Sequence, residues 1–197
     1  GFDTLGKTLP RAADIARGLL GVYVGLTAIC ALTFLWLGMS GLDAVVNAMA
    51  SIATGGFSPS DKSFGKYPGA TEYAGALFMI LGSLPYIRFM QMASGNAAPL
   101  LRDVQVRAYL LWIATAVGAV SVYRILTTDV APETVLRTSL FNLVSIFSGT
   151  GSFSDDVSAW GPFAIVVAAI IGVIGGCTSS SSGALSVFRV QVTFAAI

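Results

Sequence analysis

The chain has 197 residues, of which 55% are hydrophobic and only 11% are charged, and its mean hydropathy is +0.79. Soluble domains carry about 25% charged residues, so this composition excludes soluble globular, disordered, collagen-like and disulfide-framework proteins and indicates an integral membrane protein. The formal net charge is +1 and there is no histidine, which excludes histidine-based catalysis, histidine–zinc sites and imidazole pH switches. The two cysteines, Cys30 and Cys177, lie in apolar surroundings and do not indicate a redox compartment.

The first half of the sequence predicts two membrane spans around a shorter segment. A helix crosses the hydrocarbon core with about 20 apolar residues. Residues 18–38 reach this length without a charge, and residues 73–92 reach it with only Arg88 near the end, where a long side chain can extend to the interface. Between these spans, residues 43–53 can form a helix of about 16 Å, roughly half the membrane thickness, and a glycine turn at 54–57 follows it.

The second half repeats this order. A span, a half-length helix and a glycine turn are predicted at residues 108–126, 134–148 and 149–151. A fourth span begins at 163–174, breaks within the glycine- and serine-rich stretch 175–183, and resumes as an apolar segment over 184–197. The two turns also match in sequence, since Ser-Ile-Ala-Thr-Gly-Gly-Phe-Ser begins at Ser51 and Ser-Ile-Phe-Ser-Gly-Thr-Gly-Ser-Phe-Ser begins at Ser145. The chain therefore contains an internal repeat.

The glycine turns are the segments in which we expect the chemistry. Irregular backbone at membrane depth leaves N–H and C=O groups unpaired, so it persists only inside protein or beside a wet cavity. Glycine permits backbone angles that are closed to other residues, and the end of a half-length helix carries partial negative charge. A ring of carbonyl oxygens can then replace the water shell of a potassium ion. One Gly-Gly turn alone is more typical of a packing site or a kink; the duplication favours a filter.

These patterns predict an all-α integral membrane protein built from two membrane helix–pore helix–membrane helix repeats, like those of potassium channels. The last helix of the second repeat is expected to be broken. We expect the first repeat over residues 1–94, a cytoplasmic linker over 95–107, and the second repeat over 108–197 with an intramembrane loop at 175–183.

The distribution of positive charge predicts the orientation. Four Lys and Arg residues lie on the side to which the glycine turns open, whereas seven lie on the other side, namely Lys7, Arg11, Arg17, Arg88, Arg102, Arg107 and Arg189. The positive-inside rule places the second side in the cytoplasm. The turns should therefore face outward, among acidic residues that either concentrate cations or simply cap short helices, as Asp43 and Glu133 can. The arginines of the inner side are expected to fix topology, with docking of a cytosolic subunit as the alternative.

The ordered motifs resemble the Trk/Ktr/HKT superfamily of potassium transporters over essentially the whole chain. Residues 43–61 resemble the filter region of the second of the family's four repeats. Residues 145–163, including Asp156 and the sequence Trp-Gly-Pro-Phe that begins at Trp160, resemble the third. Residues 174–189 resemble the broken helix of that third repeat.

The resemblance implies which residues line the ion path. The filter residues would be Ala53, Thr54, Gly55, Gly56, Ser148, Gly149, Thr150 and Gly151, with potassium held at Thr54, Gly55, Gly56, Gly149, Thr150 and Gly151. The gate loop under the filter would consist of Gly175, Gly176, Cys177, Thr178, Ser179, Ser180, Ser181, Ser182 and Gly183. A hydrogen-bonded kink is the alternative interpretation of this loop.

The resemblance further implies uptake of potassium, with sodium as the alternative ion, by a multi-pass protein of the cell (inner) membrane. It implies a homodimer that contacts membrane lipid and a cytosolic nucleotide-binding regulatory subunit, with no cofactor and no nucleic-acid partner. Two features depart from the family pattern. Ser152 follows Gly151 where the family commonly has phenylalanine, which here comes one residue later as Phe153, and four consecutive serines replace a glycine-richer gate. A closed filter needs four repeats, so we expect a piece of a longer protein; pairing of two half-size chains is the alternative.

Three other functions are alternatives to potassium transport. An intramembrane serine hydrolase needs a base, but histidine is absent and the three lysines lie outside the spans, so no enzyme is expected. A sodium- or proton-coupled symporter of the same fold is disfavoured in its proton-coupled form, because none of the ten acidic residues lies centrally in a span. A non-transporting membrane scaffold would not need outward-facing half-length helices.

Overall fold

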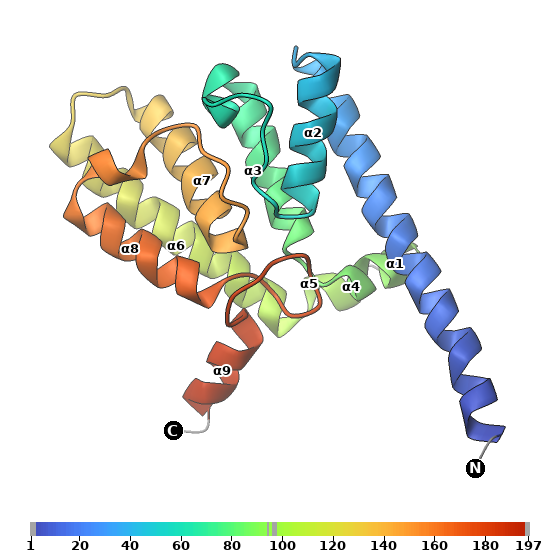
Figure 1. Cartoon of the computed structure of the whole chain (residues 1–197). Coiled ribbons are helices and arrows are strands. Elements are labelled where there is room, and N and C mark those ends of the chain that lie inside the picture. The colour runs from blue at the N-terminus through green and yellow to red at the C-terminus, as the bar shows by residue number, and fades with distance from the viewer. Residues whose placement is uncertain (1–2, 94, 96–97, 196–197) are drawn as a thin grey trace.

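The computed structural model describes residues 3–93, 95 and 98–195, and within these residues every regular element is a helix. The elements in chain order are α1 (Asp3–Trp36), α2 (Gly41–Ile52), η1 (Ser63–Lys66), α3 (Ala70–Gly82), α4 (Tyr86–Ala93), α5 (Ala98–Leu101), α6 (Val104–Thr127), α7 (Pro132–Ser148), η2 (Val157–Trp160), α8 (Pro162–Ile174) and α9 (Val187–Ala195). The helical prediction is thus confirmed. Two groups of helices, α1–α3 and α6–α8, stand side by side in Figure 1.

Two helices of the described part are long and apolar enough to cross a membrane: residues Ala12–Trp36 of α1 and the whole of α6. Both carry large apolar side chains on their outer surfaces, such as Leu32 at 65% exposed and Leu111 at 61%. Exposure of such apolar faces to water is unfavourable, whereas contact with lipid or with neighbouring apolar protein is favourable. The molecule is therefore a membrane protein.

The predicted span at 73–92 is not one straight helix. It consists of α3 and α4, which meet at an angle of 93° across the break at residues 83–85. Pro85 has no N–H to continue the helical pattern, and its ring clashes with the preceding turn. Ser83 closes the end of α3, because its hydroxyl donates to the Met79 carbonyl at 2.8 Å. The predicted segment is therefore a bent pair of helices, and the bend was not predicted because hydropathy does not register a proline within an apolar run.

The half-length helices α2 and α7 lie where the sequence predicts them, and their ends point toward the same part of the molecule (Figure 1). Ser40 caps α2 by accepting from the Asp43 backbone N–H at 3.3 Å, which satisfies one of the free donors at the helix start. Helix α7 begins with Pro132 in its first turn, two residues earlier than predicted. Proline suits this position because the N–H it lacks would have no partner there.

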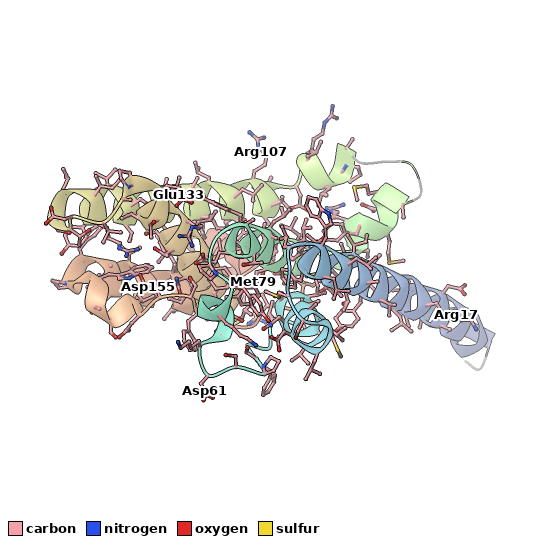
Figure 2. All side chains as sticks on the ribbon, turned by 90° about the horizontal axis from the view of Figure 1, so that it is seen from above. Arg17, Asp61, Met79, Arg107, Glu133 and Asp155 are labelled. Atoms are coloured by element: carbon pink, nitrogen blue, oxygen red, sulfur yellow. The ribbon has the colours of Figure 1, made fainter. Side chains whose placement is uncertain are left out.

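The two repeats share one core. Phe64, from the short helix η1, is fully buried; its ring lies 5.5 Å from that of Phe34 in α1 and 4.7 Å from that of Phe141 in α7. Met79 of α3 is also fully buried and lies between the two groups of helices when the molecule is seen from above (Figure 2). Helix α3 packs against α7, so the first repeat supports the half-length helix of the second.

The last membrane segment is broken, as predicted. Helix α8 ends at Ile174, and α9 begins at Val187 after an irregular stretch. This stretch, drawn in dark red in Figure 1, passes beneath the ends of α7 and α3. The predicted linker is partly helical, since α5 lies within it and α6 begins at Val104. Residues 96–97 of the linker and 196–197 of the last segment lie outside the described residues, as do 1–2 and 94.

Candidate functional site

The first glycine turn closes directly against the end of α2. The Ala53 N–H donates to the Met49 carbonyl at 2.9 Å, and the Gly55 N–H donates to the Ala50 carbonyl at 2.8 Å. Thr54 and Gly56 both have left-handed backbone conformations, with φ of 51° and 70°. Such angles turn the chain sharply away from the helix axis, and they are unfavourable for a residue that has a Cβ atom. The turn therefore holds strain at Thr54.

The second turn has a related construction at the end of α7. Gly149 has φ 74°, and its N–H donates to the Ile146 carbonyl at 3.1 Å. The Thr150 N–H donates to the Ser145 carbonyl at 2.9 Å, while the hydroxyls of Ser148 and Thr150 are 2.6 Å apart. Left-handed glycine is a common way to end a helix. Both half-length helices thus end in turns whose backbone is only partly paired.

The two turns meet. A Cβ atom placed on Gly56 would lie 2.2 Å from the carbonyl oxygen of Thr150, so the backbones are as close as glycine allows. Ser148 and Thr150 are buried at this junction, whereas Gly55 and Gly149 are exposed. The structure therefore brings together residues that are about a hundred positions apart in the sequence, and the duplication seen there becomes a single site.

The serine-rich loop is hydrogen-bonded to both turns. The Ser182 hydroxyl donates to the Ser148 carbonyl at 2.6 Å, and the Thr54 hydroxyl lies 2.9 Å from the Ser181 carbonyl. A hydrogen bond within the loop orients Ser182, because the Gly176 N–H donates to the Ser182 hydroxyl at 2.9 Å. Two hydroxyls, those of Thr54 and Ser182, therefore connect the loop to the two turns.

The bend between α3 and α4 holds the other side of the loop. The Ser181 N–H donates to the Gly82 carbonyl and the Cys177 N–H to the Ser83 carbonyl, both at 3.1 Å. The Tyr86 hydroxyl donates to the Ile52 carbonyl at 3.0 Å and lies 2.5 Å from the Ser181 hydroxyl. Sequence reasoning missed the roles of Gly82, Ser83 and Tyr86 in holding the loop. Pro85 was the available signal, since it predicts free carbonyls just before it.

A cavity of about 780 Å³ opens beside the second turn. Its lining combines apolar side chains with charged and hydroxyl groups, namely the acidic Asp61, Asp155 and Asp156, the basic Lys62, and Ser152 and Ser158. The pKa of Asp156 is lowered because Ser158 donates hydrogen bonds to its carboxylate. Neither turn contains an ionisable side chain, and the described residues contain no group of three or more His, Cys, Asp or Glu side chains that could hold a metal ion. Any cation at the turns would be bound by backbone and hydroxyl oxygens.

An ion pair fixes the N-terminal end of α2. Lys66 donates to Asp43 at 2.7 Å and the Tyr67 hydroxyl donates to the same carboxylate at 2.5 Å. The Lys66 hydrogen bond, followed by that of Tyr67, lowers the pKa of Asp43 below its usual 3.8. Asp43 in turn raises the pKa of Lys66 above its usual 10.5.

We expect this pair to stabilise the fold across neutral pH and to fail in acid. Because the pKa of Asp43 is lower in the folded state, its contribution is complete above the usual value and is lost as the pH falls through the folded value. The raised pKa of Lys66 has the opposite effect, with loss only at strongly alkaline pH. Lys66→Met should therefore reduce the free energy of unfolding at pH 7 and change it little below the folded pKa of Asp43. Unfolding in detergent at several pH values measures this difference, and a constant difference down to strong acid would contradict it. Lys62→Met in the same loop is the control.

Comparison with known proteins gives the same result as the motifs. No family model matches the chain. The Trk system potassium uptake protein TrkI of Halomonas elongata is 41% identical over 192 residues, which cover 96% of this chain and 39% of that protein. TrkH of the same organism is 31% identical over 189 residues. The crystal structure of the potassium transporter TrkH from Vibrio parahaemolyticus superposes with a TM-score of 0.88 at 25% identity and covers 94% of this chain. The chain is a homologue of the Trk potassium uptake proteins TrkH and TrkI.

The chain spans about two fifths of the length of these Trk proteins, with 39% of each Halomonas relative and 41% of the Vibrio structure covered. The resemblance stated from the motifs is therefore confirmed, and so is the TrkH-like fold. The assignment of Thr54–Gly56 and Gly149–Gly151 to an ion filter stays a prediction.

Proposed function

We propose that this Trk homologue forms two neighbouring sectors of a pore that takes up potassium across the cell (inner) membrane. The filter would be lined by Ala53–Gly56 and Ser148–Gly151, and the loop 175–183 would be its gate. Potassium is the transported substrate, and no catalytic reaction is involved. The observation that carries this proposal is the close approach of Gly56 to the Thr150 carbonyl directly above the serine-rich loop.

Backbone chemistry supports the filter. The carbonyls of the two turns are largely free of helical partners, and glycine keeps side chains away from the junction. Carbonyl dipoles can replace the water molecules around a bare alkali ion without the cost of burying a charged side chain. This is a favourable arrangement for a potassium ion that must enter and leave quickly. The names of the relatives agree with this substrate.

The proposed orientation has the turns facing outward and the α4–α5 end in the cytoplasm. Helix α4, which contains Arg88, and helix α5, which ends just before Arg102, lie on the same side of the molecule as the start of α1 (Figure 1). The positive-inside rule favours this orientation. The proposed assembly is a homodimer that works with a cytosolic nucleotide-binding regulatory subunit, as the family resemblance implies. The bend between α3 and α4 that holds the loop faces this inner end. A movement of the regulatory subunit would therefore be transmitted to the loop through the bend.

Reconstitution tests the transport function. The full-length protein is reconstituted into liposomes that contain potassium, and a tracer such as rubidium is added outside. Liposomes with the protein should accumulate the tracer. The same vesicles should accumulate little sodium. No flux above that of empty liposomes would favour the scaffold alternative, and equal rates for both ions would contradict a potassium filter.

The gate assignment predicts a leak when the loop is weakened. Ser182→Ala removes the hydroxyl that links the loop to the Ser148 carbonyl. A hydrogen bond is worth about 0.5–1.5 kcal/mol, so losing one should shift an open–closed equilibrium by roughly two- to twelvefold. Basal tracer flux without any regulatory subunit should therefore rise by a factor in this range, and shortening 178–182 should raise it further. Ser179→Ala, on the exposed side of the same loop, is the control. Unchanged leak in both altered loops would favour a structural kink.

A further inference from the structure

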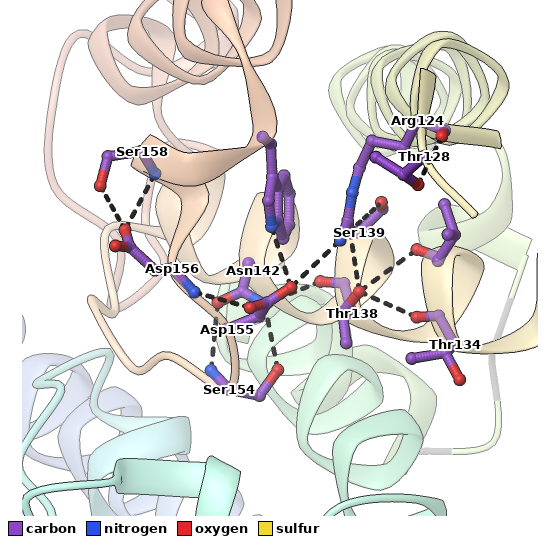
Figure 3. Close-up of polar contacts among 12 residues, drawn as sticks. Arg124, Thr128, Thr134, Thr138, Ser139, Asn142, Ser154, Asp155, Asp156 and Ser158 are labelled. Carbon is purple, nitrogen blue, oxygen red and sulfur yellow. Dashed lines mark hydrogen bonds and ion pairs between the residues drawn. The ribbon is translucent and has the colours of Figure 1, made fainter. Parts of the chain in front are cut away.

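A buried arginine lies behind the second turn. Arg124 is in the last turn of α6 and is only 5% exposed. A guanidinium in such a position must be paired, because an isolated buried charge is very unfavourable. Its Nη1 donates to the hydroxyls of Thr138 at 2.8 Å and Ser139 at 3.1 Å, both in α7 (Figure 3). Arg124 thereby fixes the half-length helix that leads into the turn.

The same guanidinium also holds the segment that leaves the turn. Its Nη2 donates to Asp155 at 3.1 Å, four residues after Gly151. The indole N–H of Trp160 donates to the same carboxylate oxygen at 2.9 Å, and the guanidinium carbon lies 3.9 Å from the centre of the Trp160 ring. Stacking on an aromatic ring adds a favourable cation–π contact and limits rotation of the guanidinium. Asp155 is therefore held in one position.

A second clamp lies between Asp155 and the turn. Asn142 of α7 donates to the Ser154 hydroxyl at 3.0 Å and accepts from the Ser154 N–H at 3.1 Å. Together, Asn142 and Arg124 tie residues 154–155 to the helix that precedes the turn, as Figure 3 shows. The backbone of Gly149–Gly151 is thus fixed at both of its ends by side chains that do not touch it.

We propose that Arg124 and Asp155 are positioning residues that set ion discrimination at the second turn. This inference rests on the proposed function. Discrimination between potassium and sodium depends on the size of the cavity and on the number of carbonyl dipoles around the ion, and residues that fix the turn backbone affect both. In metal sites, substitution of a residue that orients a metal ligand typically lowers the affinity for the metal by about 10- to 100-fold. Loss of the ion pair should loosen the turn and lower the preference for potassium, while the pore continues to conduct.

Asp155→Asn tests this inference, with Asp156→Asn as the matched control. Both variants remove one negative charge from the same cavity, but Asp156 bonds to Ser158 rather than to Arg124. A change in the potassium/sodium flux ratio that comes only from the lost charge in this cavity should appear in both variants. Positioning predicts that the potassium/sodium flux ratio of the full-length protein in liposomes falls about tenfold in Asp155→Asn, and stays near the wild-type ratio in Asp156→Asn. Asp155→Glu should recover part of the loss.

Hydrogen exchange gives a readout that does not depend on transport. The amides of residues 150–154 should exchange faster in Asp155→Asn than in wild type or Asp156→Asn. An unchanged flux ratio in folded Asp155→Asn, or equal losses in both variants, would overturn the inference while leaving the proposed function intact. If Asp155→Asn does not fold, Arg124→Lys decides, because lysine keeps the charge but not the planar fork; a wild-type ratio there overturns the inference. Wild-type protein without potassium flux would overturn the proposed function and this inference together.

Discussion

Replacing Gly56 by alanine is expected to lower the preference for potassium over sodium about tenfold or more. A left-handed φ costs alanine about 1–2 kcal/mol, and each 1.4 kcal/mol corresponds to about a factor of ten in an equilibrium. The new Cβ would also lie 2.2 Å from the Thr150 carbonyl oxygen, so one turn must push the other away. Both effects fall on the oxygens proposed to bind the ion. The flux ratio of the full-length protein in liposomes measures the change, and Gly56→Ser should act in the same direction.

Two alanine variants serve as references for Gly56→Ala. Gly151 has φ 81° but no atom within 4 Å of a Cβ placed on it, so Gly151→Ala introduces backbone strain without a collision. It should reduce the flux ratio less than Gly56→Ala. Gly25 lies within α1, and a Cβ there meets nothing within 4 Å, so Gly25→Ala should leave the ratio unchanged. Unaltered ratios in both Gly56→Ala and Gly151→Ala would reject the filter assignment.

Arg137→Leu is expected to lower the free energy of unfolding by about 3–5 kcal/mol. Arg137 of α7 pairs with Glu72 of α3, which is only 1% exposed and also accepts from the Gly69 N–H at 2.8 Å. Removing the arginine leaves a buried carboxylate without its counter-charge, and the contact between the two repeats loses its ionic link. Denaturant or thermal unfolding in detergent measures the loss.

The control for this prediction is Arg17→Leu in α1. Arg17 lies 3.8 Å from Asp14, and both side chains are more than 70% exposed. Exposed pairs contribute about 0–1 kcal/mol, so this variant should be close to wild type. Equal effects of the two substitutions would show that burial of the Arg137–Glu72 pair carries no special weight.

The sequence allowed the class, the repeat and the turns to be predicted. Low charge and long apolar runs indicate a membrane protein irrespective of how the helices pack. The half-length helices were predictable because each is too short to cross and ends in glycine, and the structure places α2 and α7 there. The break after Ile174 was predictable because a glycine- and serine-rich stretch interrupts an apolar run. All of these are local properties of the chain.

What could not be predicted depends on contacts between distant segments. The approach of Gly56 to Thr150 follows from how α3 packs on α7, which no local pattern specifies. Arg124 and Arg137 counted in the sequence only among the four positive residues on the side of the glycine turns, because their partners Asp155 and Glu72 are 31 and 65 residues away. The bend at Pro85 was within reach of local reasoning but was hidden by the hydropathy of the surrounding residues.

The hydroxyl of Ser182 would couple the proposed gate to the proposed filter through one hydrogen bond. It donates to the Ser148 carbonyl, one of the oxygens proposed to line the ion path. If the loop 175–183 is the proposed gate and moves aside, that oxygen would lose its donor, and its electron density would become fully available to a passing cation. Conductance and discrimination would then not be independent properties. Variants obtained in a search for leaky transporters should also differ from wild type in how well they tell one alkali metal from another.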